Sequence, residues 1–379
     1  MFRFFYKIFI KPVLFLFDAE FVHENMLGFG ELVGGLNPDA RSGPRQNRRG
    51  IWFLKKIFGR KYSELKQNIS GIDFESPVGL AAGFDYEAKL TQILPSLGFG
   101  FQAVGTITNQ AYPGNPKPRL GRLPKSKSLM VNKGFKNKGA KFISEKLKNF
   151  TFSNAIGISI GVTNTEKIMT VESGIEDIIP AFKIFESGGI KNSYYELNIS
   201  CPNLKVKIDF YNPENLNKLL QSVNQLGIKK PIFIKMPINI ADDEALVMLK
   251  VIAENKMAGV IFGNLQKDRN NEVLKHEEVA RFPVGYFSGK PTEKRSNELI
   301  KLAYQNFGKQ LVIIGCGGVF SAEDAYKKIK LGASLVQLIT GVIYEGPQLV
   351  SEINRDLVKL LKKDGYNNIS EAVGTESRK

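Results

Sequence analysis

The chain has 379 residues, 43% of them hydrophobic, and a formal net charge of +16 at pH 7. Two cysteines and two histidines leave little material for a disulfide framework, a structural zinc site or histidine-based triad chemistry. The positive charge favours an anionic partner. Because no RNA-binding or helix-turn-helix pattern accompanies it, we rank a phosphate cofactor or an acidic membrane surface above nucleic acid.

Residues 1–35 are predicted to form two short helices joined near Pro12 and Asp18, with Asp18 as the cap of the second helix. Charges and a proline interrupt the apolar run, whereas a membrane span needs roughly 20 mostly apolar residues. The pattern favours a helix pair lying in a membrane interface, and a helical cap packed on the rest of the chain is the alternative. A basic stripe with a spacing of four residues runs along the first helix: Arg3, Lys7 and Lys11.

Residues 36–60 are rich in glycine, proline and arginine and are predicted to be a linker with one short helix over residues 51–58. A hairpin over residues 68–75 is expected to close the bottom of the next domain. The predicted divisions of the chain are, in order, an N-terminal helical segment (1–35), a linker with the hairpin (36–76), the main domain (77–355) and a C-terminal tail (356–379).

Eight short apolar segments recur after residue 77, and helical patterns separate most of them. Short β-rich runs that alternate with helices predict a parallel sheet. Eight such units over this length predict an α/β fold, the (β/α)8 TIM barrel, in which reacting groups lie at the carboxyl ends of the strands. The expected strands are 78–83, 101–108, 155–161, 194–200, 232–237, 259–264, 311–315 and 335–341. The expected helices are 88–97, 140–148, 175–187, 213–226, 242–255, 293–307 and 322–330.

One of these strands, over residues 194–200, ends in a candidate reactive site. Pro202 stops the strand, which leaves the Cys201 thiol between the carboxamides of Asn198 and Asn203. Because an amide both donates and accepts hydrogen bonds, this pair suits a planar ligand with carbonyl and N–H groups. A thiolate beside it can take a proton from carbon, and a small cysteine buried in a turn is the alternative.

Two glycine-bearing strand ends predict a phosphate site. Residues 315–319 (Gly-Cys-Gly-Gly-Val) lie between a strand and a helix, and residues 339–341 (Ile-Thr-Gly) follow the eighth strand. Bare amides at a helix N-terminus bind phosphate, and in barrels the loops after strands seven and eight often do so together. Two tight turns are the alternative.

Lys235 lies inside an apolar strand, where an ammonium is costly unless an anion pairs with it. A phosphate or a reduced flavin is such an anion, and a lysine that reaches solvent at the strand end is the alternative. Two long loops complete the expected site. Residues 109–133 are expected to fold over the barrel mouth, and residues 203–212 to form a lid over the substrate.

Six short stretches occur in a fixed order along the chain. They are 11–18 (Lys-Pro-Val-Leu-Phe-Leu-Phe-Asp), 77–85 (Pro-Val-Gly-Leu-Ala-Ala-Gly-Phe-Asp), 105–108 (Gly-Thr-Ile-Thr), 113–120 (Pro-Gly-Asn-Pro-Lys-Pro-Arg-Leu), 198–203 (Asn-Ile-Ser-Cys-Pro-Asn) and 314–319 (Ile-Gly-Cys-Gly-Gly-Val). Together they resemble the membrane-associated, quinone-dependent class 2 dihydroorotate dehydrogenases. The resemblance implies FMN, oxidation of dihydroorotate to orotate, and reduction of a membrane quinone through the N-terminal helices. It also implies a peripheral location on an anionic membrane surface, the cytoplasmic face of a bacterial inner membrane.

The same resemblance implies roles for individual residues. Cys201 stands where the base removes the C5 proton of dihydroorotate, and Lys235 where the pyrimidine edge of the flavin is held. The residues expected to contact FMN are Ala82, Gly83, Tyr86, Thr106, Ser159, Asn198, Lys235, Gly263, Gly289, Gly318, Ile339 and Thr340. The residues expected to contact dihydroorotate are Asn132, Gly134, Phe135, Asn198, Asn203 and Asn264. No metal is expected.

Several positions depart from the family pattern. Class 2 enzymes usually carry serine as the base, whereas Cys201 resembles the soluble class 1 enzymes. Tyr86 replaces a lysine that contacts flavin and substrate, and Val131 replaces a substrate asparagine, with Asn132 one position late. The remaining departures are Ser159, Gly263 and Leu265. Because these changes cluster in the substrate pocket, two rival functions stay open: a related flavoenzyme acting on another cyclic amide, and a non-catalytic membrane-bound relative.

Overall fold

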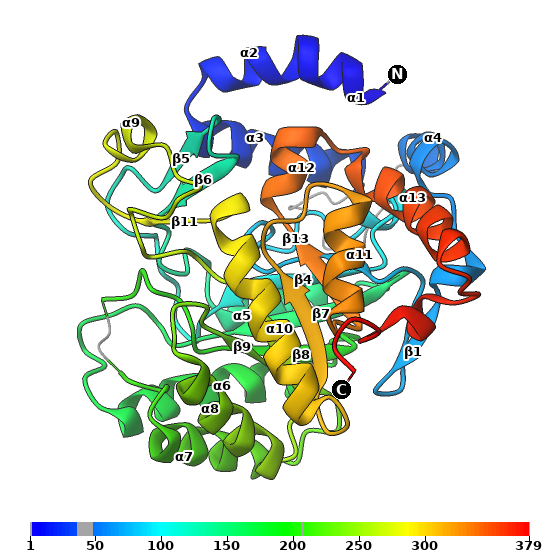
Figure 1. Cartoon of the computed structure of the whole chain (residues 1–379). Coiled ribbons are helices and arrows are strands. Elements are labelled where there is room, and N and C mark those ends of the chain that lie inside the picture. Colours follow the sequence, from blue (N-terminus) through cyan, green and yellow to red (C-terminus); the bar gives the residue numbers. More distant parts are fainter. Residues whose placement is uncertain (1, 36–47, 206–207, 379) are drawn as a thin grey trace.

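The computed structural model describes residues 2–35, 48–205 and 208–378 and shows eight parallel strands closed into a barrel, with helices around it (Figure 1). Each strand coincides with one of the eight segments predicted from the sequence, with β12 one residue longer at its end, so the predicted (β/α)8 barrel is confirmed. In barrel order the strands are β3 (Val78–Leu80), β4 (Phe101–Ile107), β7 (Ala155–Ile160), β8 (Tyr194–Asn198), β9 (Ile232–Met236), β10 (Gly259–Phe262), β12 (Val312–Cys316) and β13 (Leu335–Leu338).

The barrel strands are apolar on both faces because side chains fill the interior and helices cover the outside. At the lower end the predicted hairpin is present as β1 (Gln67–Ile69) and β2 (Ile72–Phe74). Phe74 of this hairpin lies edge-on to Phe101, with ring centroids 5.3 Å apart, and belongs to the apolar cluster inside the barrel. The hairpin therefore closes the lower end, which leaves the opposite, carboxyl end of the strands for a ligand.

The outer helices confirm the sequence prediction except over residues 88–97. There the chain forms turns and a short 3-10 helix, η3 (Leu94–Leu97), because the Asp85 carboxylate accepts hydrogen bonds from the N–H groups of Lys89 and Leu90 at 2.7 and 2.8 Å. The confirmed helices are α5 (Ala140–Leu147), α6 (Val171–Ser187), α7 (Pro213–Asn224), α8 (Asp242–Glu254), α10 (Glu293–Phe307) and α11 (Ala322–Lys330).

The sequence did not predict a small antiparallel sheet above the carboxyl end of the barrel. It consists of β5 (Leu120–Leu123), β6 (Ser128–Val131) and β11 (Tyr286–Phe287), so the long loop 109–133 contains a hairpin. A short helix, α9 (His276–Val279), lies in the loop before β11. The expected lid over 203–212 is described only in part, because residues 206 and 207 lie outside the described residues.

The N-terminal segment is divided at one point, Asp18. Helices α1 (Phe2–Phe5), η1 (Tyr6–Ile10) and α2 (Lys11–Leu16) run on without a break, because Pro12 falls in the first turn of α2, where proline is tolerated. The expected break near Pro12 is therefore wrong. The Asp18 carboxylate accepts from the Phe21 N–H at 2.9 Å and caps α3 (Ala19–Val33), as predicted. None of the described helices has the length and apolar character that crossing a bilayer requires.

Helix α3 packs on the barrel, and α1–α2 lies above α12 (Thr340–Glu345) (Figure 1). Leu27 of α3 is fully buried in the core, and Glu20 pairs with Arg119 at 2.9 Å. At the other end of the chain, α13 (Leu349–Lys363) and η5 (Ile369–Ala372) complete the same core cluster, so the boundary after residue 355 falls inside a helix. The predicted linker helix is α4 (Arg48–Phe58).

Candidate active site

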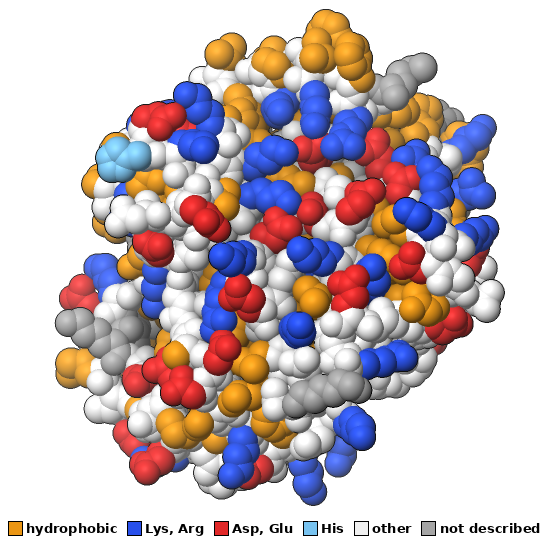
Figure 2. Space-filling view, viewed as in Figure 1, with side chains coloured by type: hydrophobic (Ala, Val, Ile, Leu, Met, Phe, Trp, Pro, Cys, Tyr) orange, Lys and Arg blue, Asp and Glu red, His pale blue; other side chains and the backbone are white. Residues whose placement is uncertain are grey.

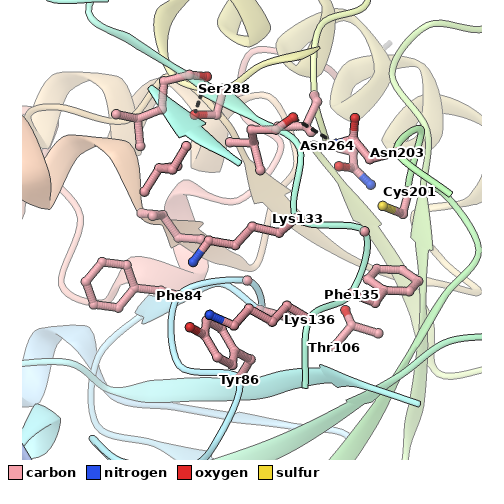
Figure 3. A pocket seen from close by; sticks show the side chains of 18 of the residues that line it. Phe84, Tyr86, Thr106, Lys133, Phe135, Lys136, Cys201, Asn203, Asn264 and Ser288 are labelled. Atoms are coloured by element: carbon pink, nitrogen blue, oxygen red, sulfur yellow. Dashed lines mark hydrogen bonds between the residues drawn. The ribbon is translucent and has the colours of Figure 1, made fainter. Parts of the chain in front are cut away.

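A cavity with about 920 Å³ of empty space opens at the carboxyl ends of the barrel strands and extends to α3. Strand ends contribute Thr106, Asn198 and Lys235, while β5 and β6 cover it with apolar side chains. Figure 3 shows Cys201, Asn203 and Asn264 together at one end of this cavity, and Phe84, Tyr86 and Lys133 toward the other. The loop 109–133 thus covers the barrel mouth, as expected.

A second cavity, with about 500 Å³ of empty space, adjoins the first and shares with it Ala82, Lys235, Ile339 and Thr340. Its remaining wall is rich in glycine from three segments that are far apart in the sequence. These are the end of β12, the start of α12 and the turn before η4 (Lys290–Thr292): Gly317, Gly318, Gly341 and Gly289. The two glycine-bearing strand ends predicted to act together therefore meet in one place.

The glycine-lined cavity has the properties of a phosphate cradle. Within the described part of the chain, the N–H groups of Gly289 and Gly318 donate to no acceptor. Gly318 has φ +74°, and a Cβ there would lie 2.3 Å from Cβ of Glu293, so only glycine fits this approach. Free amides at the start of a helix suit an anion, and FMN carries its phosphate at one end.

Lys235 is the cation between the two cavities. It lies on β9, only 4% exposed, and its ammonium makes no salt bridge and no hydrogen bond among the described residues, although the buried Glu196 carboxylate of β8 interacts with it at longer range. A buried ammonium without a partner is costly, whereas an anionic ligand group would satisfy it. Its position over both cavities excludes the alternative of a lysine that reaches solvent, and fits a flavin whose ring lies in the large cavity and whose phosphate lies in the small one.

Cys201 lies in the loop after β8, three residues beyond the strand end at Asn198. Burial raises the pKa of its thiol to about 11, although the Asn203 N–H and the Lys235 ammonium oppose this shift. The thiol therefore stays protonated at neutral pH in the ligand-free chain. Any further positive charge near Cys201, from the ligand or its surroundings, lowers the pKa of the thiol and so favours the thiolate, the form that accepts a proton.

A hydrogen-bonded row of side chains connects the strand ends beside Cys201. Asn264 donates to Ser200 at 2.6 Å, Ser200 donates to Asn198 at 3.2 Å, and Asn198 donates to Thr106 at 2.8 Å. Ser159 lies 3.0 Å from Thr106 at the end of the row, fully buried and outside the cavity lining. Ser159 therefore positions Thr106 rather than contacting a ligand, and Ser200 is a member of the row that the sequence did not reveal.

Of the predicted substrate residues, Asn132 points away from the cavity. Its side-chain oxygen accepts from Asn115 at 3.0 Å, behind Gly134. Asn203 lines the cavity and donates to the carbonyl oxygen of Val131 at 2.9 Å. Apart from Ser159 and Asn132, all residues predicted to contact FMN or substrate line one of the two cavities, with Gly263 in the smaller: Ala82, Gly83, Tyr86, Thr106, Asn198, Lys235, Gly263, Gly289, Gly318, Ile339, Thr340, Gly134, Phe135, Asn203 and Asn264.

Sequence reasoning missed a buried lysine–histidine pair between the cavity and α3. The carbonyl oxygen of Phe84 lies 2.9 Å from His23 Nε2, which therefore carries the ring proton, and Lys133 Nζ lies 3.0 Å from His23 Nδ1. Burial and the nearby Lys133 lower the pKa of His23 to about 3, and burial lowers the pKa of Lys133 to about 8. At pH 7 the lysine is thus charged and the histidine neutral.

Lys133 also places a positive charge beside Tyr86, at the position where the family pattern has a lysine. Its ammonium lies 4.7 Å from the centre of the Tyr86 ring, and the Tyr86 hydroxyl donates to Glu24 on α3. Burial and that hydrogen bond raise the pKa of Tyr86, so the ring stays a neutral phenol. No local sequence pattern predicts Lys133 as a site residue, because its place beside the cavity depends on the packing of α3 against the barrel.

These residues combine three capabilities. The glycine amides and Lys235 can hold an anionic cofactor, the amides of the strand ends can orient a planar polar substrate, and the Cys201 sulfur can take up a proton once it is a thiolate. The wall that β5, β6 and α12 form is apolar, with Leu120, Leu129 and Ile343 in its lining. An apolar second substrate can therefore approach from that side.

Comparisons with known proteins show the family of the chain. A family model described as dihydroorotate dehydrogenase matches residues 64–361. The dihydroorotate dehydrogenase (quinone) of Trichodesmium erythraeum is 34% identical over 385 residues, which cover 98% of this chain and 99% of that protein. The enzyme of the same name from Christiangramia forsetii is 37% identical over 359 residues, covering 93% and 99%. The crystal structure of the Eimeria tenella dihydroorotate dehydrogenase with ferulenol matches at a TM-score of 0.81 and 25% identity, over 96% of both chains.

Proposed function

The chain belongs to the dihydroorotate dehydrogenase family, among its quinone-dependent class 2 members, and from this premise we propose that FMN is its cofactor and Cys201 its base. The enzyme oxidises dihydroorotate to orotate in pyrimidine biosynthesis with a quinone as electron acceptor. The observation that carries the cofactor proposal is Lys235, a buried ammonium that no salt bridge or hydrogen bond satisfies among the described residues, beside the glycine-lined cavity.

In this proposal the chain holds FMN at two places. The amides of Gly289 and Gly318 and the start of α12 bind its phosphate, and Lys235 pairs with the pyrimidine edge of its ring. Bound FMN supplies the hydride acceptor and the path for electrons to the quinone. The chain's own contribution is to keep the ring against Ala82, Gly83 and Thr106 and to compensate negative charge beside Lys235.

Cys201 acts on the substrate in the same proposal. Asn198, Asn203 and Asn264 orient the cyclic amide through its carbonyl and N–H groups, and the thiolate removes the proton from C5. The row from Asn264 through Ser200 to Thr106 fixes these amides before the substrate arrives, so little ordering is needed on binding. Tyr86 and Val131, which depart from the family pattern, both line this cavity. The Lys133 ammonium lies over the Tyr86 ring, and Asn203 donates a hydrogen bond to the carbonyl oxygen of Val131.

The FMN proposal predicts a yellow protein that releases about one FMN per chain on denaturation. Gly318→Ala is expected to lose most of the FMN, because the new Cβ would have to lie 2.3 Å from Glu293 in a backbone conformation that favours glycine. Released FMN is measured by fluorescence, and circular dichroism checks the fold. Gly28→Ala is the matched control, since a Cβ at Gly28 meets nothing within 4 Å. A colourless wild-type protein that takes up no added FMN would refute the proposal.

A membrane location is supported by the outer side of the N-terminal helices. Phe4, Phe9 and Leu16 are 67%, 56% and 83% exposed, and Figure 2 shows a crest of hydrophobic side chains over α1 and α2. Such a surface suits the interface of a bilayer, where a quinone resides. The bacterial sources of the similar proteins support the cytoplasmic face of the inner membrane as the location.

The basic stripe of Arg3, Lys7 and Lys11 faces the barrel rather than the bilayer in this arrangement. Arg3 and Lys7 both pair with Glu345 of α12, and Lys11 donates to the carbonyl oxygen of Tyr344 at 3.4 Å. Burial raises the pKa of Glu345, but hydrogen bonds from Lys7 and Arg3 outweigh this effect and hold the pKa below its usual value. The stripe thus anchors α1–α2 to the barrel, and Glu345 compensates part of its charge.

A further inference from the structure

Among the described residues, helix α4 contacts the rest of the molecule through one of its sides. Leu54 packs against the core cluster, and the buried Phe58 ring lies edge-on to Phe2 of α1, with centroids 5.2 Å apart. The same side contacts η3. These contacts fix which side of α4 faces away from the barrel.

The outward side of α4 carries large aromatic side chains. Trp52 is 62% exposed and its neighbour Phe53 is 58% exposed, although a helix on a water-facing surface normally presents polar residues there. Figure 1 places α4 at the same end of the molecule as α1, and the Phe2–Phe58 contact joins the two helices. The exposed aromatics of α4 therefore continue the hydrophobic surface over α1 and α2.

Helix α4 also carries positive charge on its outward side, whereas the basic stripe of α1–α2 faces the barrel. Lys55 and Lys56 are exposed, and neither pairs with a carboxylate among the described residues. The Lys56 ammonium lies 5.3 Å from the centre of the Trp52 ring, so charge and aromatic surface are adjacent. Tryptophan prefers the headgroup level of a bilayer, and lysine reaches headgroup phosphates from beside it.

We propose that α4 is a third membrane-docking helix, which places Trp52 and Phe53 at the headgroup level of a phospholipid bilayer and binds anionic headgroups through Lys55 and Lys56. The inference rests on the proposed membrane location and adds the element that selects anionic lipid. Helices α1 and α2 supply the apolar contact, and α4 supplies the electrostatic contact.

Trp52 is the sole tryptophan of the chain, so its fluorescence reports directly on α4. The full-length, FMN-loaded protein is mixed with vesicles of phosphatidylcholine containing phosphatidylglycerol, and with vesicles of phosphatidylcholine alone. With the anionic vesicles, Trp52 emission is expected to shift to shorter wavelength and to be protected from acrylamide quenching. High salt should weaken this binding, because exposed charges are screened.

The paired substitution Lys55→Gln and Lys56→Gln tests the charge. At about 1 kcal/mol for each basic residue near an anionic surface, affinity for the anionic vesicles should fall about 30-fold at low salt. Lys301→Gln with Lys309→Gln removes the same charge from exposed positions on and just beyond α10 and should leave the affinity unchanged. Equal loss in both pairs, or no loss in the α4 pair, would show that α4 does not select anionic lipid.

The fluorescence separates this inference from the membrane location on which it rests. If the protein sediments with vesicles but Trp52 emission does not change, α4 is not a docking element, while the membrane location stands. If the protein sediments with neither kind of vesicle, both ideas fail. A shift that depends on protein concentration without vesicles would identify the surface as a contact between copies of the chain and overturn the inference.

Discussion

Cys201→Ala is expected to slow reduction of the bound flavin by dihydroorotate by about 10²–10⁴-fold, the usual range for losing an acid–base group. The variant should keep its FMN, because the thiol lies at the substrate end of the cavity and the glycine amides lie in the other one. Anaerobic stopped-flow measurement of flavin bleaching tests this without quinone. Near-normal reduction by the alanine variant would exclude Cys201 as the base.

The pH profile provides a second test of the same role. Burial raises the pKa of the Cys201 thiol to about 11, and only the thiolate can accept the proton. Below that pKa the thiolate fraction rises tenfold with each pH unit, so reduction should be up to about 100-fold faster at pH 9 than at pH 7. Cys201→Ser, whose hydroxyl hardly ionises in this range, should lose the rise and retain more activity than the alanine variant. A flat wild-type profile contradicts the assignment.

Removal of residues 2–16 is expected to lower the reduction of a long-chain quinone and the affinity for vesicles by at least about 10-fold each, because the exposed aromatic surface is lost. Flavin reduction by dihydroorotate should stay close to the wild-type rate. The cut must stop before α3. The barrel depends on that helix, since Leu27 is fully buried and His23 lines the cavity.

The truncation needs one accompanying change. Glu345 is 4% exposed and loses both of its partners, Arg3 and Lys7, so its carboxylate would be left buried and unpaired. Glu345→Gln in the shortened chain removes that charge, and the same substitution in the full-length chain is the control. If the shortened protein binds vesicles and reduces the long-chain quinone at the full-length rate, α1 and α2 are not the route to the membrane.

The sequence by itself determined the barrel, because each strand is a short apolar run bounded by turn residues and each following helix has its own apolar side. These are local signals that burial on both faces of a parallel sheet makes strong. It also located the ends of the strands, and therefore most of the residues that line the two cavities. Where a distant partner overrides local preference the prediction fails, as over 88–97, where the Asp85 carboxylate organises the turn.

Only the tertiary structure decided which side chains face one another. Lys133 and His23 lie 110 residues apart and become a buried pair because α3 packs over the barrel mouth. The basic stripe of α1–α2 has the periodicity of a membrane-facing surface, yet α12 presents Glu345 to it and turns it inward. Periodicity defines the sides of a helix, but which side is buried depends on the charge and shape of the element against which it packs.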